Sequence, residues 1–193
     1  DVATAEVNDE ELNDAEMLSM LQQFLVAGNE TTTKLLTNLI HRLAVDSELE
    51  DKLRSNPDLI DNFIEEGLRY EAPVGGLFRM AKEDTQVNDI EIKAGDHLWV
   101  IYAAANRDPA IFDNPDDFLV DRENAREHLA FGHGEHYCIG ALLARKEARI
   151  AIQLLLANIE NIQLVEDKNK YEYEESFVLR GLKELHVSYD VIS

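Results

Sequence analysis

The sequence predicts a mainly α-helical unit with small β-hairpins. Two long stretches with apolar residues at helical spacing indicate helices, one near the start of the chain and one at residues 140–161. Between them, strand-forming residues at 87–102 predict a hairpin. No internal repeat or linker divides the 193 residues. We therefore expect a loose acidic tail at 1–9 followed by a single unit at 10–193.

The unusual bulk property is charge: 39 acidic residues against 18 basic ones give a net charge of −21. This balance argues against nucleic acid and anionic membranes as partners, because both require basic patches. The acids are spread along the chain, which favours a solvated acidic surface over a site for a basic partner. The longest apolar runs are too short to span a bilayer, and no leader-like segment opens the sequence. With one free cysteine, these features predict a cytoplasmic protein.

The first predicted helix begins near Asn13, which has Glu16 three residues later, the spacing of a capping box. Apolar residues then recur at helical spacing as far as Leu43, which implies a helix of about thirty residues. Two shorter helices are expected at 47–55 and 59–70.

The later segments change character. Residues 87–92 and the apolar run 98–102 flank a glycine-containing turn, which predicts that they pair as one hairpin. Residues 106–126 are rich in Asn, Asp and Pro and predict an irregular loop. After the helix at 140–161, residues 177–187 predict a second hairpin centred on a glycine.

The first helix contains an unfavourable stretch, Ala27-Gly28-Asn29-Glu30-Thr31-Thr32. A glycine inside a helix costs about 1 kcal/mol relative to alanine, and β-branched threonines add to that cost. Residues that break local rules concentrate at functional sites. The alternative is that the threonine hydroxyls only hydrogen-bond to preceding carbonyls and bend the helix.

Cys138 is the only cysteine, and it lies in a glycine-rich segment directly before a predicted helix. The N-terminus of a helix stabilises a thiolate, which suits a metal ligand or a nucleophile. Three interpretations stay open on these residues alone. Cys138 is a structural cysteine, a catalytic nucleophile with a histidine base, or a zinc ligand together with His128, His133 and His136.

Residues Phe131 to Gly140 resemble the haem-binding loop of the cytochrome P450 family, Phe-x-x-Gly-x-His/Arg-x-Cys-x-Gly, at every fixed position. The resemblance implies that Cys138 is the thiolate ligand of a haem iron, and thiolate donation favours cleavage of the O–O bond. It also implies that His136 hydrogen-bonds a haem propionate. Phe131, Gly132 and Gly140 would lie in the cofactor-binding loop, with Gly140 allowing the next helix to pass close to the porphyrin.

The stretch at 27–32 resembles the oxygen-activation motif of the same family, Ala/Gly-Gly-x-Asp/Glu-Thr. By resemblance, Ala27 and Gly28 leave room for oxygen beside the haem. Glu30 and Thr31 would be the catalytic pair that delivers protons. An acid beside an alcohol suits this role, because one supplies protons and the other positions them.

Three further matches follow in family order. Glu66 and Arg69 match the Glu-x-x-Arg motif, and Arg122 matches the third member of that structural network. Arg79 matches an arginine that binds a haem propionate, for which a bidentate guanidinium–carboxylate contact is suited. Together the matches resemble the C-terminal portion of the cytochrome P450 fold, of bacterial type.

The resemblance implies a haem-thiolate monooxygenase that inserts one oxygen atom from O2 into an organic substrate. Apolar residues near Val26 and at 74–77 would line the pocket, so a small, partly hydrophobic substrate is expected. Electrons would come from a ferredoxin-type redox partner. A basic patch suited to such a partner is expected near the cysteine loop, with ordinary helix surface as the alternative; its residues are Arg126, Arg145, Lys146 and Arg149.

A second function remains open. Complete members of the family are considerably longer, and the resemblance begins just before the oxygen-binding helix. In this second interpretation, the chain is a folded, non-catalytic fragment that holds no stable haem and self-associates through its exposed haem-side surface.

Overall fold

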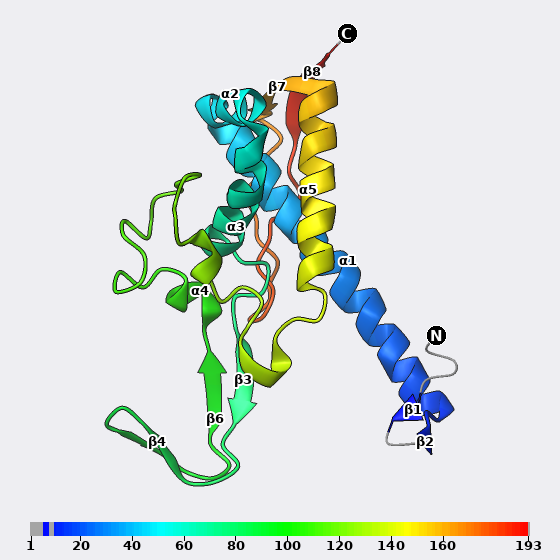
Figure 1. Cartoon of the computed structure of the whole chain (residues 1–193), viewed down its shortest axis with the longest axis vertical. Coiled ribbons are helices and arrows are strands. Elements are labelled where there is room, and N and C mark those ends of the chain that lie inside the picture. The colour runs from blue at the N-terminus through cyan, green and yellow to red at the C-terminus, as the bar shows by residue number, and fades with distance from the viewer. Residues whose placement is uncertain (1–5, 8–9, 193) are drawn as a thin grey trace.

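The computed structural model describes residues 6–7 and 10–192 (Figure 1). The helices are α1 (Asp14–Val45), α2 (Ser47–Ser55), α3 (Ile60–Tyr70), α4 (Tyr102–Ala105) and α5 (Ala141–Asn158), with 3-10 turns at Pro57–Leu59, Ala125–Glu127 and Gly134–His136. The strands are β1 (Glu6–Val7), β2 (Glu10–Glu11), β3 (Leu77–Met80), β4 (Thr85–Val87), β5 (Ile90–Ile92), β6 (His97–Val100), β7 (Ile159–Leu164) and β8 (Val187–Val191).

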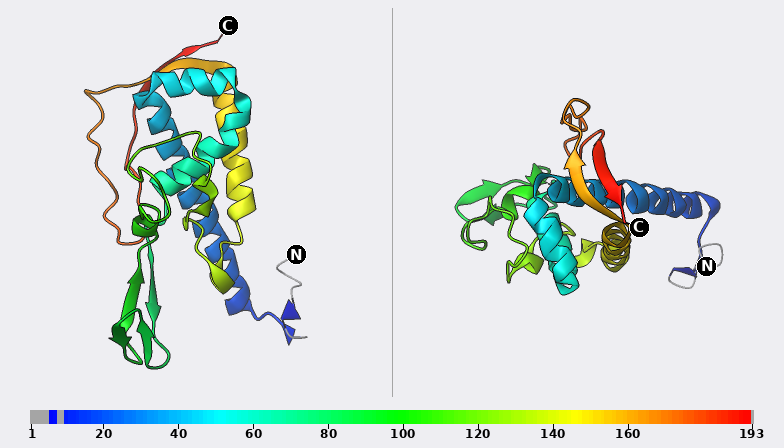
Figure 2. Two further views of the ribbon diagram at one scale, coloured as in Figure 1. Left: turned by 60° about the vertical axis from the view of Figure 1, so that its left-hand side comes forward. Right: turned by 90° about the horizontal axis from the view of Figure 1, so that it is seen from above.

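The described strands pair antiparallel, two by two: β1 with β2, β3 with β6, β4 with β5, and β7 with β8. Figure 2 shows β7 and β8 beside one end of the helices, while β3–β6 and β4–β5 extend from the other. The mainly helical fold with small antiparallel sheets is confirmed. Of the predicted acidic tail, 6–7 form β1; residues 1–5 and 8–9 lie outside the described residues.

The start of α1 is fixed by a complete capping box. The Asn13 side chain accepts hydrogen bonds from the backbone of Ala15 and Glu16, and the Glu16 carboxylate accepts one from the Asn13 backbone. At the other end, Asp46 terminates α1 and its carboxylate caps α2 by accepting from Leu49 N. These local caps explain why the helix bounds follow from the sequence.

The core lies where the second half of α1 meets α3 and α5. Gly67 is needed there, because a Cβ on it would lie 2.4 Å from Leu39 Cδ2. The glycine therefore allows α3 to pack closely against α1. The largest apolar side chains of the core cluster are all nearly inaccessible and come from five elements: Leu35, Leu39, Leu43, Leu53, Phe63, Ile64, Leu68, Ile152 and Ile162.

The hairpin expected at 87–102 is wrong, because the two segments predicted to pair with each other belong to different strand pairs. Residues 90–92 do turn back, but they pair with 85–87. The apolar run instead supplies β6, which pairs with β3 in the register Phe78↔Trp99 and Arg79↔Leu98. Phe78 and Trp99 stack at 5.8 Å between ring centroids, which favours this pairing.

The helix expected at 140–161 ends three residues earlier, at Asn158. Arg54 of α2 donates to the carbonyls of Leu156 and Ile159, and it is held by Glu50 at 2.6 Å. The other oxygen of Glu50 accepts from Ile162 N at 3.0 Å. This partly buried pair satisfies carbonyls at the end of α5 and at the start of β7.

The second hairpin expected at 177–187 is also wrong. β8 begins at Val187 and pairs with β7, while the preceding residues form single bridges, Val74↔Leu179 and Tyr173↔Leu182. Gly181 is not a hairpin turn. A Cβ there would lie 2.6 Å from Lys34 Cγ, so the glycine permits close approach to α1.

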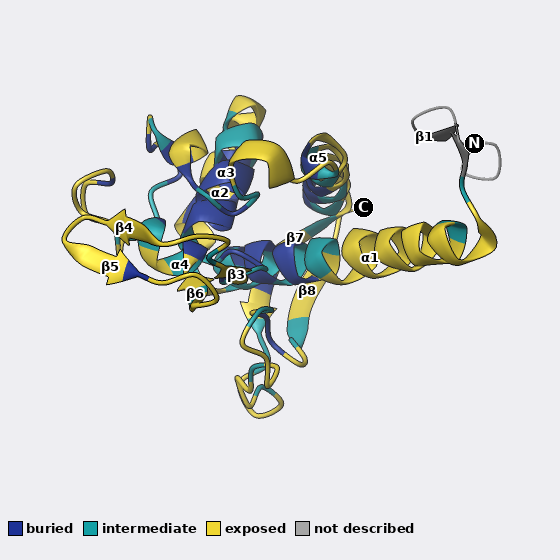
Figure 3. Ribbon diagram, turned by 90° about the horizontal axis from the view of Figure 1, so that it is seen from below, coloured by how far each residue is buried: buried dark blue, intermediate teal, exposed yellow. Residues whose placement is uncertain are grey.

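The two halves of α1 have different surroundings (Figure 3). From Lys34 onward, one face is buried, whereas residues 18–30 are exposed throughout. The exposed half carries large apolar side chains, among them Leu21, Phe24 and Leu25. Among the described residues, none of the helices is long and apolar enough to cross a membrane.

Candidate functional site

The cysteine loop runs from Phe131 into the start of α5. Gly132 and Gly134 have φ of +72° and +74°, a region that favours glycine, and they turn the chain around a short 3-10 helix. The loop closes through Cys138 N, which donates to Phe131 O at 2.9 Å. Cys138 itself is a free, exposed thiol, and its carbonyl accepts from Ala141 N at 3.2 Å as α5 begins.

The structure does not support the zinc alternative. Within residues 12–192, whose side chains the structure describes, no group of three or more His, Cys, Asp or Glu side chains lies close enough to hold a metal ion. His128 is buried and contacts Glu65, whereas His133, His136 and Cys138 are exposed. The four residues therefore do not form a shared ligand set.

The stretch at 27–32 stays helical. Ala27 and Gly28 lie on the exposed half of α1, and a Cβ on Gly28 would meet nothing within 4 Å. Thr31 Oγ1 donates to Ala27 O at 2.7 Å, so the hydroxyl oxygen keeps its capacity to accept a hydrogen bond. Glu30 lies 3.5 Å from Lys34 Nζ, which also approaches Glu174 at 3.8 Å.

Glu66, Arg69 and Arg122 come together in the core. Arg69 makes a bidentate pair with Glu66 at 2.7 and 2.8 Å, and Arg122 Nε lies 3.1 and 3.2 Å from the two carboxylate oxygens. Glu66 also accepts from Leu119 N at 2.8 Å. The arginines donate to carbonyls of the irregular loop: Asn106, Asp113, Asn114, Pro115 and Asp117.

Arg79 is brought to the surface by β3. Its guanidinium donates to the neighbouring Phe78 carbonyl at 2.9 Å, and it makes no ion pair with a carboxylate among residues 12–192, whose side chains the structure describes. Figure 1 places β3, the cysteine loop before α5 and the exposed half of α1 toward the same end of the molecule. An exposed thiol, an unpaired guanidinium and apolar surface are the groups that iron, a propionate and a porphyrin ring require, so these residues fit a haem.

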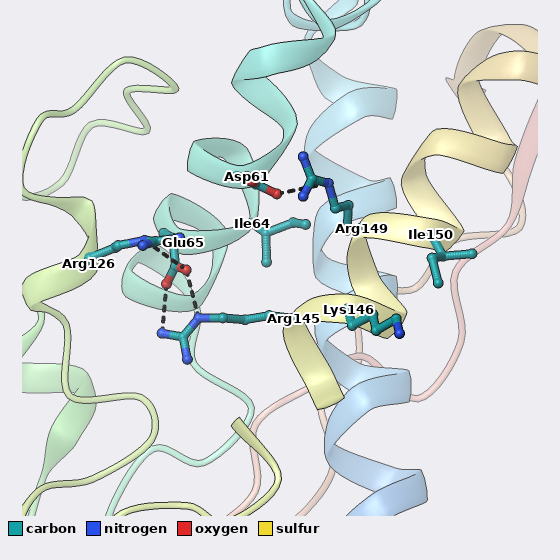
Figure 4. A pocket seen from close by; sticks show the side chains of 8 residues that line it. All are labelled: Asp61, Ile64, Glu65, Arg126, Arg145, Lys146, Arg149 and Ile150. Atoms are coloured by element: carbon teal, nitrogen blue, oxygen red, sulfur yellow. Dashed lines mark hydrogen bonds and ion pairs between the residues drawn. The ribbon is translucent and has the colours of Figure 1, made fainter. Parts of the chain in front are cut away.

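The sequence did not reveal one cluster beside the cysteine loop. Glu65 is 2% exposed, and its carboxylate accepts from Arg145 at 2.7 and 3.0 Å and from His128 Nε2 at 3.1 Å. Arg126 Nε lies 3.3 Å away (Figure 4). Burial alone would raise the pKa of Glu65, but the hydrogen bonds from His128 and Arg145 lower it to about 2.

The same cluster borders a hollow of about 400 Å³, with Asp61 paired to Arg149 at 3.2 Å on its other side (Figure 4). The sequence suggests His128 only as a zinc ligand, and Arg145 only as part of a basic patch for a redox partner or as ordinary helix surface. No local pattern marks Glu65, because its partners lie 63 and 80 residues further along the chain.

These features define a haem-thiolate type of protein: a helical unit with a glycine-rich loop that presents a cysteine at the start of a helix. Comparison with known proteins supports this class. The cytochrome P450 family model matches residues 2–186. The chain is 42% identical over 186 residues to a cytochrome P450 of Bacillus subtilis, covering 96% of this chain and 45% of that protein.

Solved structures agree. Mycobacterium marinum cytochrome P450 CYP150A6, substrate-free, superposes with a TM-score of 0.95 at 38% identity, covering 99% of this chain and 49% of that one. P450BioI in complex with a hexadec-9Z-enoic acid-ligated acyl carrier protein has a TM-score of 0.88 at 40% identity, covering 93% and 46%.

The chain belongs to the cytochrome P450 family. Members of this family bind a haem iron through a cysteine thiolate. The chain spans about half the length of the relatives it matches, since the match covers 45% of the first of them.

Proposed function

We propose that this chain supplies the thiolate side and the oxygen-activation helix of a haem monooxygenase, with Cys138 as the iron ligand. One observation carries the proposal: the only cysteine is exposed at the start of α5, in a loop closed by the Cys138 N–Phe131 O hydrogen bond. When bound, the haem supplies the oxygen-activating chemistry.

The binding residues complement the cofactor. Arg79 and His136 would hold the two haem propionates, since one is an unpaired guanidinium among the described residues and the other an exposed imidazole. Phe131, Gly132 and Gly140 shape the loop around Cys138. Glu66, Arg69 and Arg122 hold the preceding loop in place and touch no reacting group.

Glu30 and Thr31 are proposed to move protons. Thr31 Oγ1 already donates to Ala27 O, so its free lone pairs accept a proton donor such as water. Glu30 supplies the proton, and its carboxylate lies 3.5 Å from Lys34 Nζ. Gly28 leaves the adjoining space open.

The substrate is proposed to be small and partly hydrophobic. Val26 on α1 and Leu77 on β3 are both exposed apolar side chains on the elements expected to line the pocket. One structural relative is seen with a hexadec-9Z-enoic acid carried by an acyl carrier protein. A long-chain acyl group is therefore the first substrate class to test.

A ferredoxin-type partner is proposed to deliver electrons at the hollow beside the cysteine loop. Four basic residues line it, Arg126, Arg145, Lys146 and Arg149, against Glu65 and Asp61. This local basic excess contrasts with the net charge of −21 and would attract an acidic protein.

The decisive experiment is a haem titration of the chain, followed by the spectrum of its reduced, carbon-monoxide-bound form. A thiolate-type spectrum that is lost in Cys138→Ser supports the proposal. Haem uptake with the same spectrum in the variant would exclude Cys138 as the ligand.

A second candidate is a folded, non-catalytic fragment that self-associates. It is favoured by the exposed apolar side chains of α1 and of the start of α5, where Ile139 is 92% and Leu142 82% exposed. Patches of this kind mark interaction surfaces. Sedimentation analysis decides between the two: a concentration-dependent dimer without haem uptake supports this candidate, and a monomer that binds haem supports the first.

A further inference from the structure

The cysteine loop is held from outside by a set of buried and partly buried polar groups distinct from the Glu66–Arg69–Arg122 network. The central member of this set is Glu65, which lies on α3 and is 2% exposed. Buried carboxylates need several donors to offset their lost hydration. Here those donors come from the two segments on either side of Cys138.

His128, on the chain before the cysteine loop, supplies one donor and is itself held in a single tautomer. Its Nδ1 accepts a hydrogen bond from Ala130 N at 3.1 Å, so the ring proton must be on Nε2. Nε2 then donates to Glu65 at 3.1 Å. The imidazole therefore links the segment leading into the loop to α3.

Arg145, in the second turn of α5, supplies the other donors. Its guanidinium pairs with both oxygens of Glu65, lies 4.5 Å from the centre of the Phe131 ring, and reaches Tyr137 Oη at 3.3 Å. Phe131 and Tyr137 lie at the first position of the loop and directly before Cys138. One side chain thus contacts both ends of the segment that the Cys138 N–Phe131 O hydrogen bond closes.

We propose that Glu65, His128 and Arg145 are positioning residues that fix the conformation of the Cys138 loop, with Arg145 as the connecting member. The inference rests on the proposed function only in taking Cys138 to be the iron ligand. The loop has few constraints of its own: residues 133–139 are all exposed. The geometry of the thiol therefore depends on contacts made outside the loop.

The test is amide hydrogen exchange and Cys138 alkylation by iodoacetamide in the 193-residue chain, without haem. Arg145→Gln should raise exchange in residues 131–138 and the alkylation rate by about tenfold, because it removes charge-assisted hydrogen bonds and ring stacking. Exchange in the core around Leu39 should not change.

Arg180→Gln is the matched control. Arg180 also pairs with a glutamate at the end of α3, Glu71 at 3.3 Å, and lies 4.2 Å over an aromatic ring, that of Tyr173. Neither partner is in the cysteine loop, so this variant should leave loop exchange at the parent value. Equal loop exchange in Arg145→Gln and Arg180→Gln overturns the proposal.

Arg145→Lys covers the case in which Arg145→Gln does not fold. Lysine keeps the charge beside Glu65 but cannot make the two-pronged pair. Parent-like exchange in the loop of Arg145→Lys overturns the proposal, and raised exchange with an intact core supports it.

A second readout uses haem-loaded protein. The thiolate-type fraction of the reduced, carbon-monoxide-bound spectrum should fall in Arg145→Lys and stay unchanged in Arg180→Gln. If Cys138→Ser leaves that spectrum unaltered, the proposed function fails, whereas the exchange measurement without haem still decides whether the network positions the loop.

Discussion

Glu65 and Glu66 are adjacent on α3 and both buried, yet their carboxylates bind different arginines in different parts of the chain. Glu66 holds Arg69 and Arg122 and, through them, the irregular loop before the cysteine. Glu65 holds Arg145 on the helix after it. Successive helical residues point about 100° apart, so one turn of α3 serves two segments.

Glu66→Gln should lower the free energy of unfolding by about 3–5 kcal/mol, because it leaves two buried arginines without their shared counter-charge. Urea denaturation followed by circular dichroism measures this loss. The control is Lys52→Ala, which breaks an exposed pair with Asp121 at 3.3 Å and should cost less than about 1 kcal/mol. Equal effects of the two variants would contradict the structural role of Glu66.

The low pKa of Glu65 predicts an acid-sensitive contribution to stability. The hydrogen bonds from His128 and Arg145 hold the folded-state pKa at about 2, below the ordinary value of 4.5. Ionised Glu65 therefore makes its full contribution to the free energy of unfolding, about 3 kcal/mol, above about pH 5. This contribution is lost as the pH falls toward about 2.

Unfolding by urea across about pH 3 to 7 tests this. Glu65→Gln should reduce the loss of stability on acidification, whereas Glu147→Gln, at an exposed position on α5, should keep the parent slope. A parent-like slope in Glu65→Gln would show that other carboxylates carry the acid sensitivity.

How far the sequence alone predicts this structure depends on where each determinant lies. The start of α2 follows from Asp46 directly before it. By contrast, α5 ends at Asn158 because Arg54, about a hundred residues earlier, reaches its last carbonyls. The partner of β6 depends on long-range pairing in the same way, since a strand pattern does not specify its neighbour.

The candidate site also contains some residues that local sequence motifs suggest and others that only the folded structure brings together. Cys138, Glu30, Thr31 and Glu66 belong to contiguous motifs, so the sequence alone is enough to propose roles for them. The link from Glu65 to His128 and Arg145 exists only after folding, and each member alone resembles an ordinary surface charge. Arg122 is intermediate: only the family resemblance suggested its place beside Glu66.

Thr31→Ala should leave stability nearly unchanged, because the lost hydrogen bond to Ala27 O is offset by the better helix propensity of alanine. In haem-loaded protein that turns over substrate, it should raise electron consumption per product formed. Thr33→Ala removes the same kind of bond, to Asn29 O at 2.9 Å, and is the matched control. Identical coupling in both variants would remove Thr31 from proton delivery.

Lys146→Glu should slow reduction of the haem by an acidic ferredoxin about threefold to tenfold at low salt, with little effect at high salt, where charges are screened. Stopped-flow reduction at two ionic strengths measures the effect. Lys168→Glu makes the same charge change at an exposed position away from the hollow. A rate that falls equally in both variants would argue against docking at Lys146.

Gly181→Ala should destabilise the chain by about 1–3 kcal/mol, because its Cβ would lie within 3.1 Å of three carbons of the buried Lys34 side chain. Gly75→Ala is the control, since its Cβ would meet the nearest atom, Val178 O, at 3.8 Å. Thermal unfolding compares them. Similar midpoint temperatures of unfolding for the two variants would mean that the Lys34 side chain moves aside at little cost in free energy.

The uneven burial of α1 has a consequence for the order of assembly. The buried core draws on this helix only from Lys34 onward, so the packing of α1, α3 and α5 does not need the turns before it to be covered. Residues 27–31 lie at the boundary. A segment that packed on the exposed turns would therefore contact a core that does not depend on it, and it would meet that core beside residues 27–31.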